Sequence, residues 1–295
     1  MPPALAQSLP LLAGAAYAAS ALWSKRACIE GGGVWRITFL TNWGQALFLL
    51  PLIGSGEGFP DGQALLHVGI TSLLFFLGQV VVFAGLRFGD VSVLTPVMGI
   101  KVLAVAALSV ALSGNPLPTR WWWAAGLASA SAALLGLGGR GSGEKRRLLA
   151  GVLGGGGAAL AFAGVDLCFQ FWGGTLGVWR FTSLVMLATA LWSLLLLPWL
   201  EGPWFRLPSP ARQAFLPSLA MNLVQVVLMA YCVVVLQGAA WANLLYSSRG
   251  LWSVLLVWSL GPAFGNQERE AGAAQMLRRL AGSALLLAAI ALVLL

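Results

Sequence analysis

The sequence predicts an all-α polytopic membrane protein whose ten transmembrane helices form two inverted five-helix repeats. Of the 295 residues, 59% are hydrophobic and only 9% are charged, whereas a soluble domain carries roughly a quarter charged residues. Apolar runs of about 20 residues recur from end to end, and each is long enough to cross about 30 Å of hydrocarbon. Because these runs are continuous and do not alternate between apolar and polar residues, they exclude a transmembrane β-barrel.

Glycine and proline mark the ends of the predicted helices, because both residues favour turns. The first apolar run starts near Leu9 with no basic region before it, so we predict a true span there and no cleaved signal peptide. In chain order, the later breaks include Gly31-Gly-Gly, Gly54-Ser-Gly, Gly89-Asp, Gly114-Asn-Pro, Gly138-Gly-Arg-Gly-Ser-Gly, Gly173-Gly, Pro208-Ser-Pro and Gly261-Pro. The predicted helices lie at about 8–25, 34–53, 63–86, 91–112, 119–138, 148–171, 178–199, 213–236, 239–260 and 276–295.

Short motifs recur in the two halves of the chain in a common register. The four pairs, at separations of 144, 146, 148 and 151 residues, are Gly33-Val-Trp-Arg-Ile-Thr with Gly177-Val-Trp-Arg-Phe-Thr, Gln79-Val-Val with Gln225-Val-Val, Lys101 with Arg249, and Gly114-Asn with Gly265-Asn. The separation rises in one direction only, as small loop insertions would produce. The pattern therefore predicts a duplication.

The duplication divides the membrane domain into a first repeat at residues 1–138 and a second at residues 148–295, joined by a basic loop at 139–147. Five helices per repeat is an odd number, so the second repeat enters the membrane upside down relative to the first. Inverted repeats of this kind place the substrate site near the bilayer midplane, between the two halves.

The loop charges predict the orientation in the membrane. We number the loops in chain order, so that the first loop joins the first two helices. The odd-numbered loops and their borders hold Lys25, Arg26, Arg36, Arg87, Arg140, Lys145, Arg146, Arg147, Arg206, Arg212, Arg269, Arg278 and Arg279, and the even-numbered loops hold only Arg120 and Arg180. Cytoplasmic loops carry the excess of lysine and arginine. We therefore expect odd-numbered loops in the cytoplasm and both termini outside, in the inner membrane of a bacterium.

Two cations, Lys101 and Arg249, lie in the middle of apolar stretches at matching places in the two halves. A charge near the midplane costs roughly 2.5–3.5 kcal/mol on insertion scales, so it is rarely kept without a partner, a wet cavity or a ligand. In the functional interpretation the two residues clamp an anion, with arginine as a bidentate fork and lysine as a point charge. In the structural alternative, Asp166 neutralises one cation and the other bonds backbone carbonyls near Pro96. Asp166 is the only carboxylate inside a predicted helix.

The chain resembles the drug/metabolite transporter superfamily, in particular its ten-helix EamA-like exporters. The motifs that carry the resemblance are Arg36 and Arg180 at two helix starts, Leu86-Arg-Phe-Gly-Asp-Val-Ser-Val-Leu-Thr-Pro, and the Gly114-Asn-Pro-Leu-Pro turn. The resemblance implies that helices one, three, four, six, eight and nine line a central cavity, which helices five and ten brace.

Two features depart from these exporters. Their termini usually lie in the cytoplasm, opposite to the orientation that the loop charges predict here. They also do not generally need midplane cations, whereas basic residues on helices four and nine clasp phosphate in the related plastid phosphate translocators. Lys101 and Arg249 lie on the corresponding predicted helices, which favours an anionic substrate.

Polar residues on the expected lining helices make up the candidate site. The candidate substrate-binding residues are Lys101, Arg249, Gln79, Thr95, Gln225, Asn243, Tyr246 and Ser248. Asp166 is assigned either to ion pairing or to proton coupling, the second by analogy with the embedded acid of the small multidrug relatives. Arg36 and Arg180, beside tryptophans, are interpreted as interfacial anchors.

These residues favour a secondary transporter that moves a small polar metabolite, anionic or zwitterionic, by alternating access coupled to protons or to exchange. The alternative is an exporter of neutral amino acids or amphiphilic drugs in which Lys101 and Arg249 are structural. An intramembrane enzyme is less favoured, because His67 is the only histidine and no nucleophile–base pair is evident. A membrane scaffold without transport is less favoured, because it predicts polar residues on an outward face and not on the lining helices. We expect no metal, no cofactor and no nucleic acid, since the three cysteines and the basic residues are scattered. The expected partners are the substrate and the bilayer, and the protein is expected to be a monomer or a homodimer.

Overall fold

The computed structural model describes residues 3–56, 58–88, 94, 97–136, 145–260 and 273–294, and the regular elements within these ranges are all helical. The helices are α1 (Pro3–Ala27), α2 (Val34–Leu49), α3 (Gly62–Phe88), α5 (Lys101–Ser113), α6 (Thr119–Gly136), α7 (Lys145–Trp172), α8 (Val178–Trp192), α9 (Ser209–Ala230), α10 (Ala239–Tyr246), α11 (Arg249–Leu260) and α12 (Ala273–Leu294). Short π or 3₁₀ turns extend α1, α2, α8 and α9 at their C-terminal ends.

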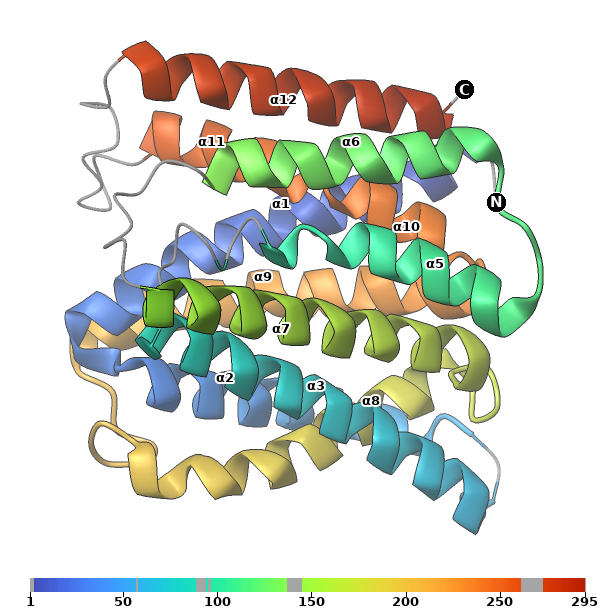
Figure 1. Ribbon diagram of the computed structural model, residues 1–295. Coiled ribbons are helices and arrows are strands. Elements are labelled where there is room, and N and C mark those ends of the chain that lie inside the picture. Colours follow the sequence, from blue (N-terminus) through green and yellow to red (C-terminus); the bar gives the residue numbers. More distant parts are fainter. Residues whose placement is uncertain are drawn as a thin grey trace.

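Six helices in the described part of the chain are long and apolar enough to cross a membrane, and α5 and the end of α12 form shorter apolar segments. The helices run side by side across the view of Figure 1, with the connections at two opposite edges. One edge carries the turns at 28–33 and 200–208, and we call it the odd-loop face. The other carries both termini and the turns at 55–61, 114–118, 173–177 and 236–238, and we call it the even-loop face. The predicted fold class, an all-α polytopic membrane protein, is confirmed.

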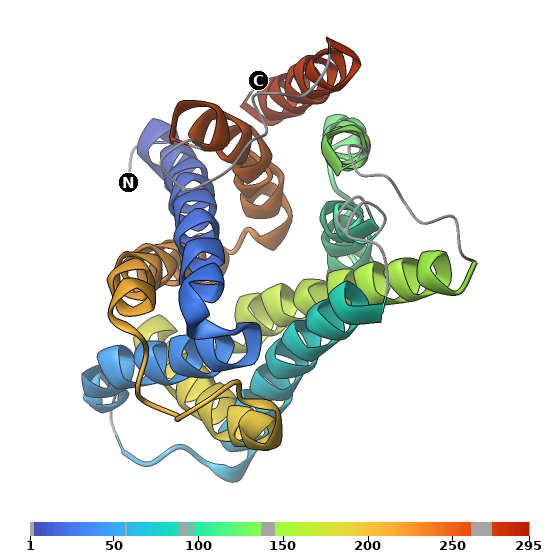
Figure 2. The same ribbon diagram turned by 90° about the vertical axis from the view of Figure 1, so that its left-hand side faces the viewer.

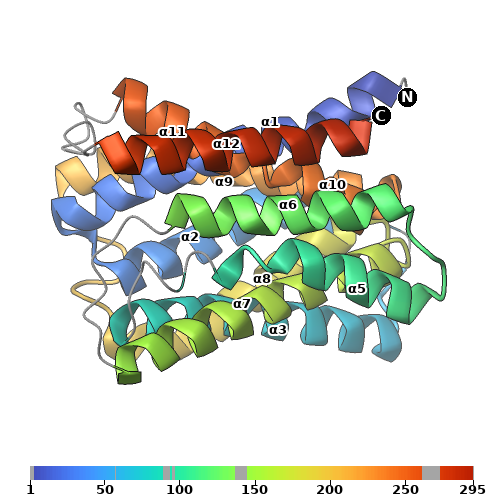
Figure 3. The same cartoon turned by 45° about the horizontal axis from the view of Figure 1, so that its top comes forward.

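Helices from the two halves pack in reciprocal pairs, as Figures 2 and 3 show. Helix α1 lies along α9, where the Ser20 hydroxyl donates to the Ser218 carbonyl at 2.9 Å. Helix α7 lies along α3, and their backbones approach so closely that a Cβ on Gly154 would lie 2.7 Å from the Cα of Gly85. Helix α2 packs against α8, and α6 packs against α12.

This arrangement repeats itself when the halves are exchanged, because α7 and α9 are the predicted counterparts of α1 and α3. An inverted duplication produces such pairing. The proposed boundaries of the repeats stay a prediction, since residues 137–144 fall outside the described part of the chain.

The ninth predicted helix, 239–260, is interrupted where a single continuous helix was expected. Helix α10 ends at Tyr246, a turn covers Ser247 and Ser248, and α11 begins at Arg249. The Ser248 amide donates to the Leu245 carbonyl at 3.0 Å, three residues back. The Ser247 hydroxyl donates to the Leu244 carbonyl at 2.5 Å, and serine hydroxyls that bond the preceding turn are known to bend helices. Hydrophobicity alone continues through such a turn, so the prediction missed it.

The fourth predicted helix, 91–112, has a turn at the matching place. Gly99 and Ile100 form the turn, and α5 begins at Lys101. The Ile100 amide donates to the Val97 carbonyl at 3.1 Å, again three residues back. Each predicted midplane cation is therefore the first residue of a half-helix. Residues 89–93 and 95–96, with the candidate Thr95 and with Pro96, lie outside the described residues.

A glycine in the other half of the molecule packs against each interrupted helix. A Cβ on Gly14 of α1 would lie 2.7 Å from Ser248 Oγ and 3.0 Å from the Arg249 amide. A Cβ on Gly155 of α7 would lie 2.6 Å from the Leu94 carbonyl oxygen. These two glycines are 141 residues apart, which extends the register of the repeated motifs. Only glycine allows backbones to approach so closely at these two positions.

Arg36 and Arg180 are buried, with only 3% and 7% of their surface exposed. The interpretation as snorkelling anchors is therefore wrong. Arg36, in the first turn of α2, donates through Nε to the Gly32 carbonyl at 2.8 Å and through Nη1 to the Arg206 carbonyl at 3.3 Å. Arg180, in the first turn of α8, donates through Nη2 to the Gly58 carbonyl at 2.6 Å.

The two contacts are reciprocal. Arg36 on α2 holds the loop that follows α8, and Arg180 on α8 holds the loop that follows α2. A glycine with positive φ precedes each helix, Gly33 at 68° and Gly177 at 77°, so the repeated Gly-Val-Trp-Arg motif forms the same turn twice. We call these two contacts the arginine clasps. They fix the start of α2 at the odd-loop face and the start of α8 at the even-loop face.

Candidate functional site: a cation pair at two interrupted helices

Lys101 forms an ion pair at the start of α5. Its Nζ lies 2.7 Å from Oδ2 of Asp166 on α7, and the two side chains are 14% and 17% exposed. Asn243 on α10 donates through Nδ2 to the same Asp166 oxygen at 2.9 Å and to the Ala239 carbonyl at 2.9 Å. Asp166 therefore joins α5, α7 and α10, and its charge is compensated by Lys101.

Arg249 lies between two tyrosine rings at the start of α11. Its guanidinium carbon is 5.1 Å from the ring centre of Tyr17 on α1 and 5.2 Å from that of Tyr246 on α10. The two rings meet edge to face, with centres 5.9 Å apart. Such cation–π contacts stabilise a cation by roughly 0.5–2 kcal/mol each, and their energy increases when the cation is desolvated. They therefore stabilise the charged guanidinium but supply no negative charge to balance it.

The two cations differ in their acidic partners. The other described acids are engaged elsewhere: Glu30 lies 3.6 Å from Arg26, Asp61 accepts from the Ala64 amide at 2.7 Å, and Glu201 accepts from the Arg36 amide at 3.3 Å. Lys101 takes the carboxylate of Asp166. In the part of the chain that the structure describes, Arg249 thus has no ion pair.

Unpartnered polar atoms lie on the same two segments. Asn243 is 1% exposed and Ser248 is 3% exposed, yet Asn243 Oδ1 and Ser248 Oγ find no hydrogen-bond partner among the described residues. Buried polar groups are normally hydrogen-bonded, and an orphan requires an explanation. Asn243, Tyr246 and Arg249 follow one another at intervals of three residues, about 4.5 Å of helix rise each. The Asn243 acceptor and the Ser248 hydroxyl therefore belong to the same segment as Arg249, whose guanidinium has no ion pair among the described residues.

A second polar group lies on α1, α2, α3 and α9. The carboxamides of Asn42 and Gln79 bond each other twice, at 2.9 and 3.1 Å. Gln45, one turn further along α2, donates to Asn222 on α9. Asn222 in turn lies 3.4 Å from the Ser20 hydroxyl on α1. These side chains satisfy one another and bind the helices together.

The structure brings together six of the predicted site residues: Lys101, Asp166, Asn243, Tyr246, Ser248 and Arg249. It places Gln79 in the α2–α3 amide pair. Gln225 is partly buried on α9 and makes no hydrogen bond within the described ranges. The roles of all these residues in transport stay predictions.

Tyr17 is the main site residue that the sequence did not reveal. It lies in an ordinary apolar run, and its contact with Arg249 spans most of the chain. The only hint in the sequence is that tyrosine is rare, with three in the whole protein. That rarity does not predict which residue Tyr17 contacts.

The long apolar helices define an all-α polytopic membrane protein. Interrupted helices with buried polar groups beside them are a feature of membrane transporters. Residues 5–137 match the family model of the EamA-like transporter family. The match confirms the resemblance to the drug/metabolite transporter superfamily and indicates a membrane transporter of small molecules. The protein is accordingly an integral membrane protein.

The solved structures support the fold. A crystal structure described only as "Crystal structure of protein" is similar over 97% of this chain and 96% of its own, with a TM-score of 0.69 and 18% sequence identity. At this identity the likeness concerns the fold alone. The search of curated proteins gave no match.

Proposed function

We propose that the protein is a secondary transporter that moves a small anionic or zwitterionic metabolite by alternating access, with Arg249 as the centre of the anion site. The observation that carries the proposal is the guanidinium without a carboxylate among the described residues, 5.1 and 5.2 Å from two tyrosine rings. A midplane charge that lacks a protein counter-ion needs water or a ligand. A carboxylate or phosphate group on the substrate supplies that counter-ion.

Asp166 gives this transporter a route to proton coupling. While Asp166 is charged, it occupies Lys101 at 2.7 Å. A proton on Asp166 removes that charge, frees Lys101 and adds a second cation to the anion site. Proton binding and anion binding thus favour each other, and thermodynamic linkage makes the effect reciprocal. A transporter that exchanges one anion for another leaves Asp166 charged throughout.

The alternative function, export of a neutral amino acid or an amphiphile, receives support from the same ion pair. Lys101 already has Asp166 as its partner, and Asp166 also accepts from Asn243. For Lys101 a structural role is therefore sufficient. Arg249 distinguishes the two functions, because only the anion transporter requires a free guanidinium.

The proposed orientation has the odd-loop face in the cytoplasm of a bacterial cell, with both termini outside. It is supported by the excess of basic residues in the odd-numbered loops. Two of these residues, Arg206 and Arg212, are exposed at the described 200–208 turn on that face and just after it.

Thermal unfolding of the purified protein with acetate, benzoate and methyl phosphate tests the proposal. The wild type is compared with Arg249→Gln, Arg249→Lys and Arg120→Gln, the last an exposed arginine on α6. We expect at least one anion to stabilise the wild type and Arg120→Gln, to lose its effect in Arg249→Gln, and to keep part of it in Arg249→Lys. Stabilisation by cationic or neutral amphiphiles alone, unchanged in Arg249→Gln, would favour the alternative function.

A further inference from the structure

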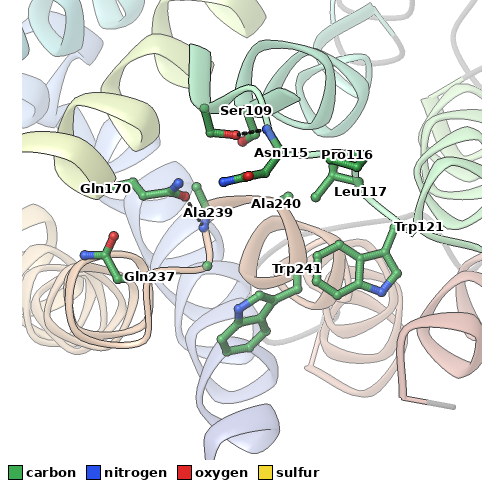
Figure 4. Close-up of a pocket in the computed structure, with 12 residues that line it drawn as sticks. Ser109, Asn115, Pro116, Leu117, Trp121, Gln170, Gln237, Ala239, Ala240 and Trp241 are labelled. Atoms are coloured by element: carbon green, nitrogen blue, oxygen red, sulfur yellow. Dashed lines mark hydrogen bonds between the residues drawn. The ribbon is translucent and has the colours of Figure 1, made fainter. Parts of the chain in front are cut away.

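A pocket of about 200 Å³ opens at the even-loop face, between the end of α5 and the start of α10. Figure 4 shows the carboxamides of Gln170 and Asn115 reaching into it from different sides, with the rings of Trp121 and Trp241 along another wall. Its rim is exposed at Ser113 and Asn115, while Ser109 and Ala239 deeper in are buried. This volume is large enough to hold several water molecules.

The deep end of the pocket carries an unpartnered hydroxyl. Ser109 is 5% exposed, and its Oγ has no hydrogen-bond partner within the described part of the chain. Gln170 uses Oε1 to accept from the Ala239 amide at 2.8 Å, which leaves its amide nitrogen as a donor. The buried Ser109 hydroxyl and the Gln170 amide nitrogen therefore line the same cavity, and each can form a hydrogen bond with a ligand there.

The pocket adjoins the Lys101–Asp166 ion pair. Gln170 follows Asp166 by four residues on α7, and Ala239 precedes Asn243 by four residues on α10, about 6 Å of helix rise in each case. The contacts of Gln170 with Ala239 and of Asp166 with Asn243 form two successive cross-links between these helices. The deep end of the pocket consequently lies about one helical turn from Asp166.

The lining selects against charge. None of the described residues that line the pocket is charged, so it offers an ion no counter-charge. Carboxamides donate and accept at once, and they match a ligand group that does the same, such as a primary amide. Two indole rings provide flat apolar surface for the rest of the molecule.

We propose that this pocket is a binding vestibule for a small uncharged molecule that combines an amide or a similar donor–acceptor group with a flat apolar part. The role of the vestibule as the first binding site on a transport path rests on the proposed function, whereas the binding of an uncharged molecule in the pocket does not. In that role the vestibule receives the uncharged part of a substrate before the charged part reaches Arg249.

Cysteine labelling tests whether the pocket is wet and binds this class of molecule. Ser109→Cys replaces the deep hydroxyl, and Ser131→Cys on α6 is the matched control, because Ser131 is buried against α12 and donates to the Gly282 carbonyl at 2.7 Å. Both purified proteins are treated with methyl methanethiosulfonate, a small uncharged thiol reagent, with wild type as the background for the three native cysteines. We expect Ser109→Cys to react at least tenfold faster than Ser131→Cys.

Two probes of the same shape then separate uncharged from charged ligands. Benzamide should slow the labelling of Ser109→Cys at least fivefold at saturation, and benzoate should slow it much less. Equal labelling of the two cysteines, or labelling that benzamide does not slow, would overturn the proposal. If Ser109→Cys fails to fold, Ser113→Cys on the exposed rim supports the same protection measurement.

The result is independent of the anion site. Protection by benzamide should persist in Arg249→Gln, since no cation is found among the described residues that line the pocket. A protein that shows this protection but no anion stabilisation that depends on Arg249 would retain the vestibule and lose the proposed anion transport. The reverse outcome would remove the vestibule alone.

Discussion

Lys101 and Arg249 are each the first residue of a half-helix that follows a two-residue turn, yet among the described residues only Lys101 forms an ion pair. The two residues are 148 positions apart and occupy equivalent places in the two halves of the chain. Equivalent positions thus have different partners: one cation has an ion pair, and the other has none within the described part of the chain. The ion pair is the natural place to begin testing this difference.

Replacement of Asp166 by asparagine should destabilise the protein, because it leaves Lys101 without its partner 2.7 Å away. Loss of one member of a buried pair costs up to about 3–5 kcal/mol, and partial exposure of this pair places the expected loss at about 1–3 kcal/mol. Thermal unfolding in detergent measures it. In a double-mutant cycle of Asp166→Asn, Lys101→Met and their combination, the double variant should recover part of the loss, and additive losses would show that the two residues do not interact.

Replacement of Gly14 by valine should disturb the turn before Arg249, because even a Cβ would lie 2.7 Å from Ser248 Oγ and 3.0 Å from the Arg249 amide. We expect at least tenfold weaker anion binding and a lower unfolding temperature. Gly126→Val on α6 is the matched control, since nothing lies within 4 Å of a Cβ at that position. Equal effects of the two variants would show that the α1 contact does not position Arg249.

Replacement of Arg36 by glutamine should open one arginine clasp. The variant loses the bonds to the Gly32 and Arg206 carbonyls and should be less stable by about 2–4 kcal/mol, since hydrogen bonds to charged groups contribute about 1.5–3 kcal/mol each and are not additive. Arg206→Gln is the control, because it keeps the accepting backbone carbonyl and alters only an exposed side chain. Thermal unfolding of both variants in parallel measures the loss of stability, and similar stabilities of the two variants would contradict a structural role for the clasp.

The orientation can be measured in intact cells with a membrane-impermeant methanethiosulfonate. Asn115→Cys is exposed on the even-loop face and Arg206→Cys on the odd-loop face. The loop charges predict labelling of Asn115→Cys from outside and labelling of Arg206→Cys only after the membrane is permeabilised. The opposite pattern would give this protein the usual orientation of the exporters that it resembles.

The features that depend on composition and register can be predicted from the sequence. Continuous apolar runs predict the helices, and four matched motifs assign Lys101 and Arg249 to equivalent positions in the two halves. Asp166 is the only acid in a predicted helix, which makes it the expected partner of one cation. The structure adds that this partner is Lys101, at 2.7 Å.

The remaining features depend on contacts between distant parts of the chain. The turn at Ser247 and Ser248 is stabilised locally by hydroxyl and backbone bonds, but hydrophobicity does not report it. The contact between Tyr17 and Arg249, and the grip of Arg36 on the 200–208 loop, arise only when α1 and α2 pack against the second half. Arg36 also shows that a tryptophan beside an arginine does not by itself indicate a membrane-interface anchor, because here the arginine is 3% exposed.

The central claim, that Arg249 carries an anion site, is tested most directly by the affinities of benzoate and benzamide, two probes of one shape that differ in charge. Calorimetric titration of wild type and Arg249→Gln gives all four values. We predict that Arg249→Gln weakens benzoate binding at least tenfold and leaves benzamide binding unchanged. Benzoate affinity that is the same in both proteins, or lost equally in Arg120→Gln, would contradict the account.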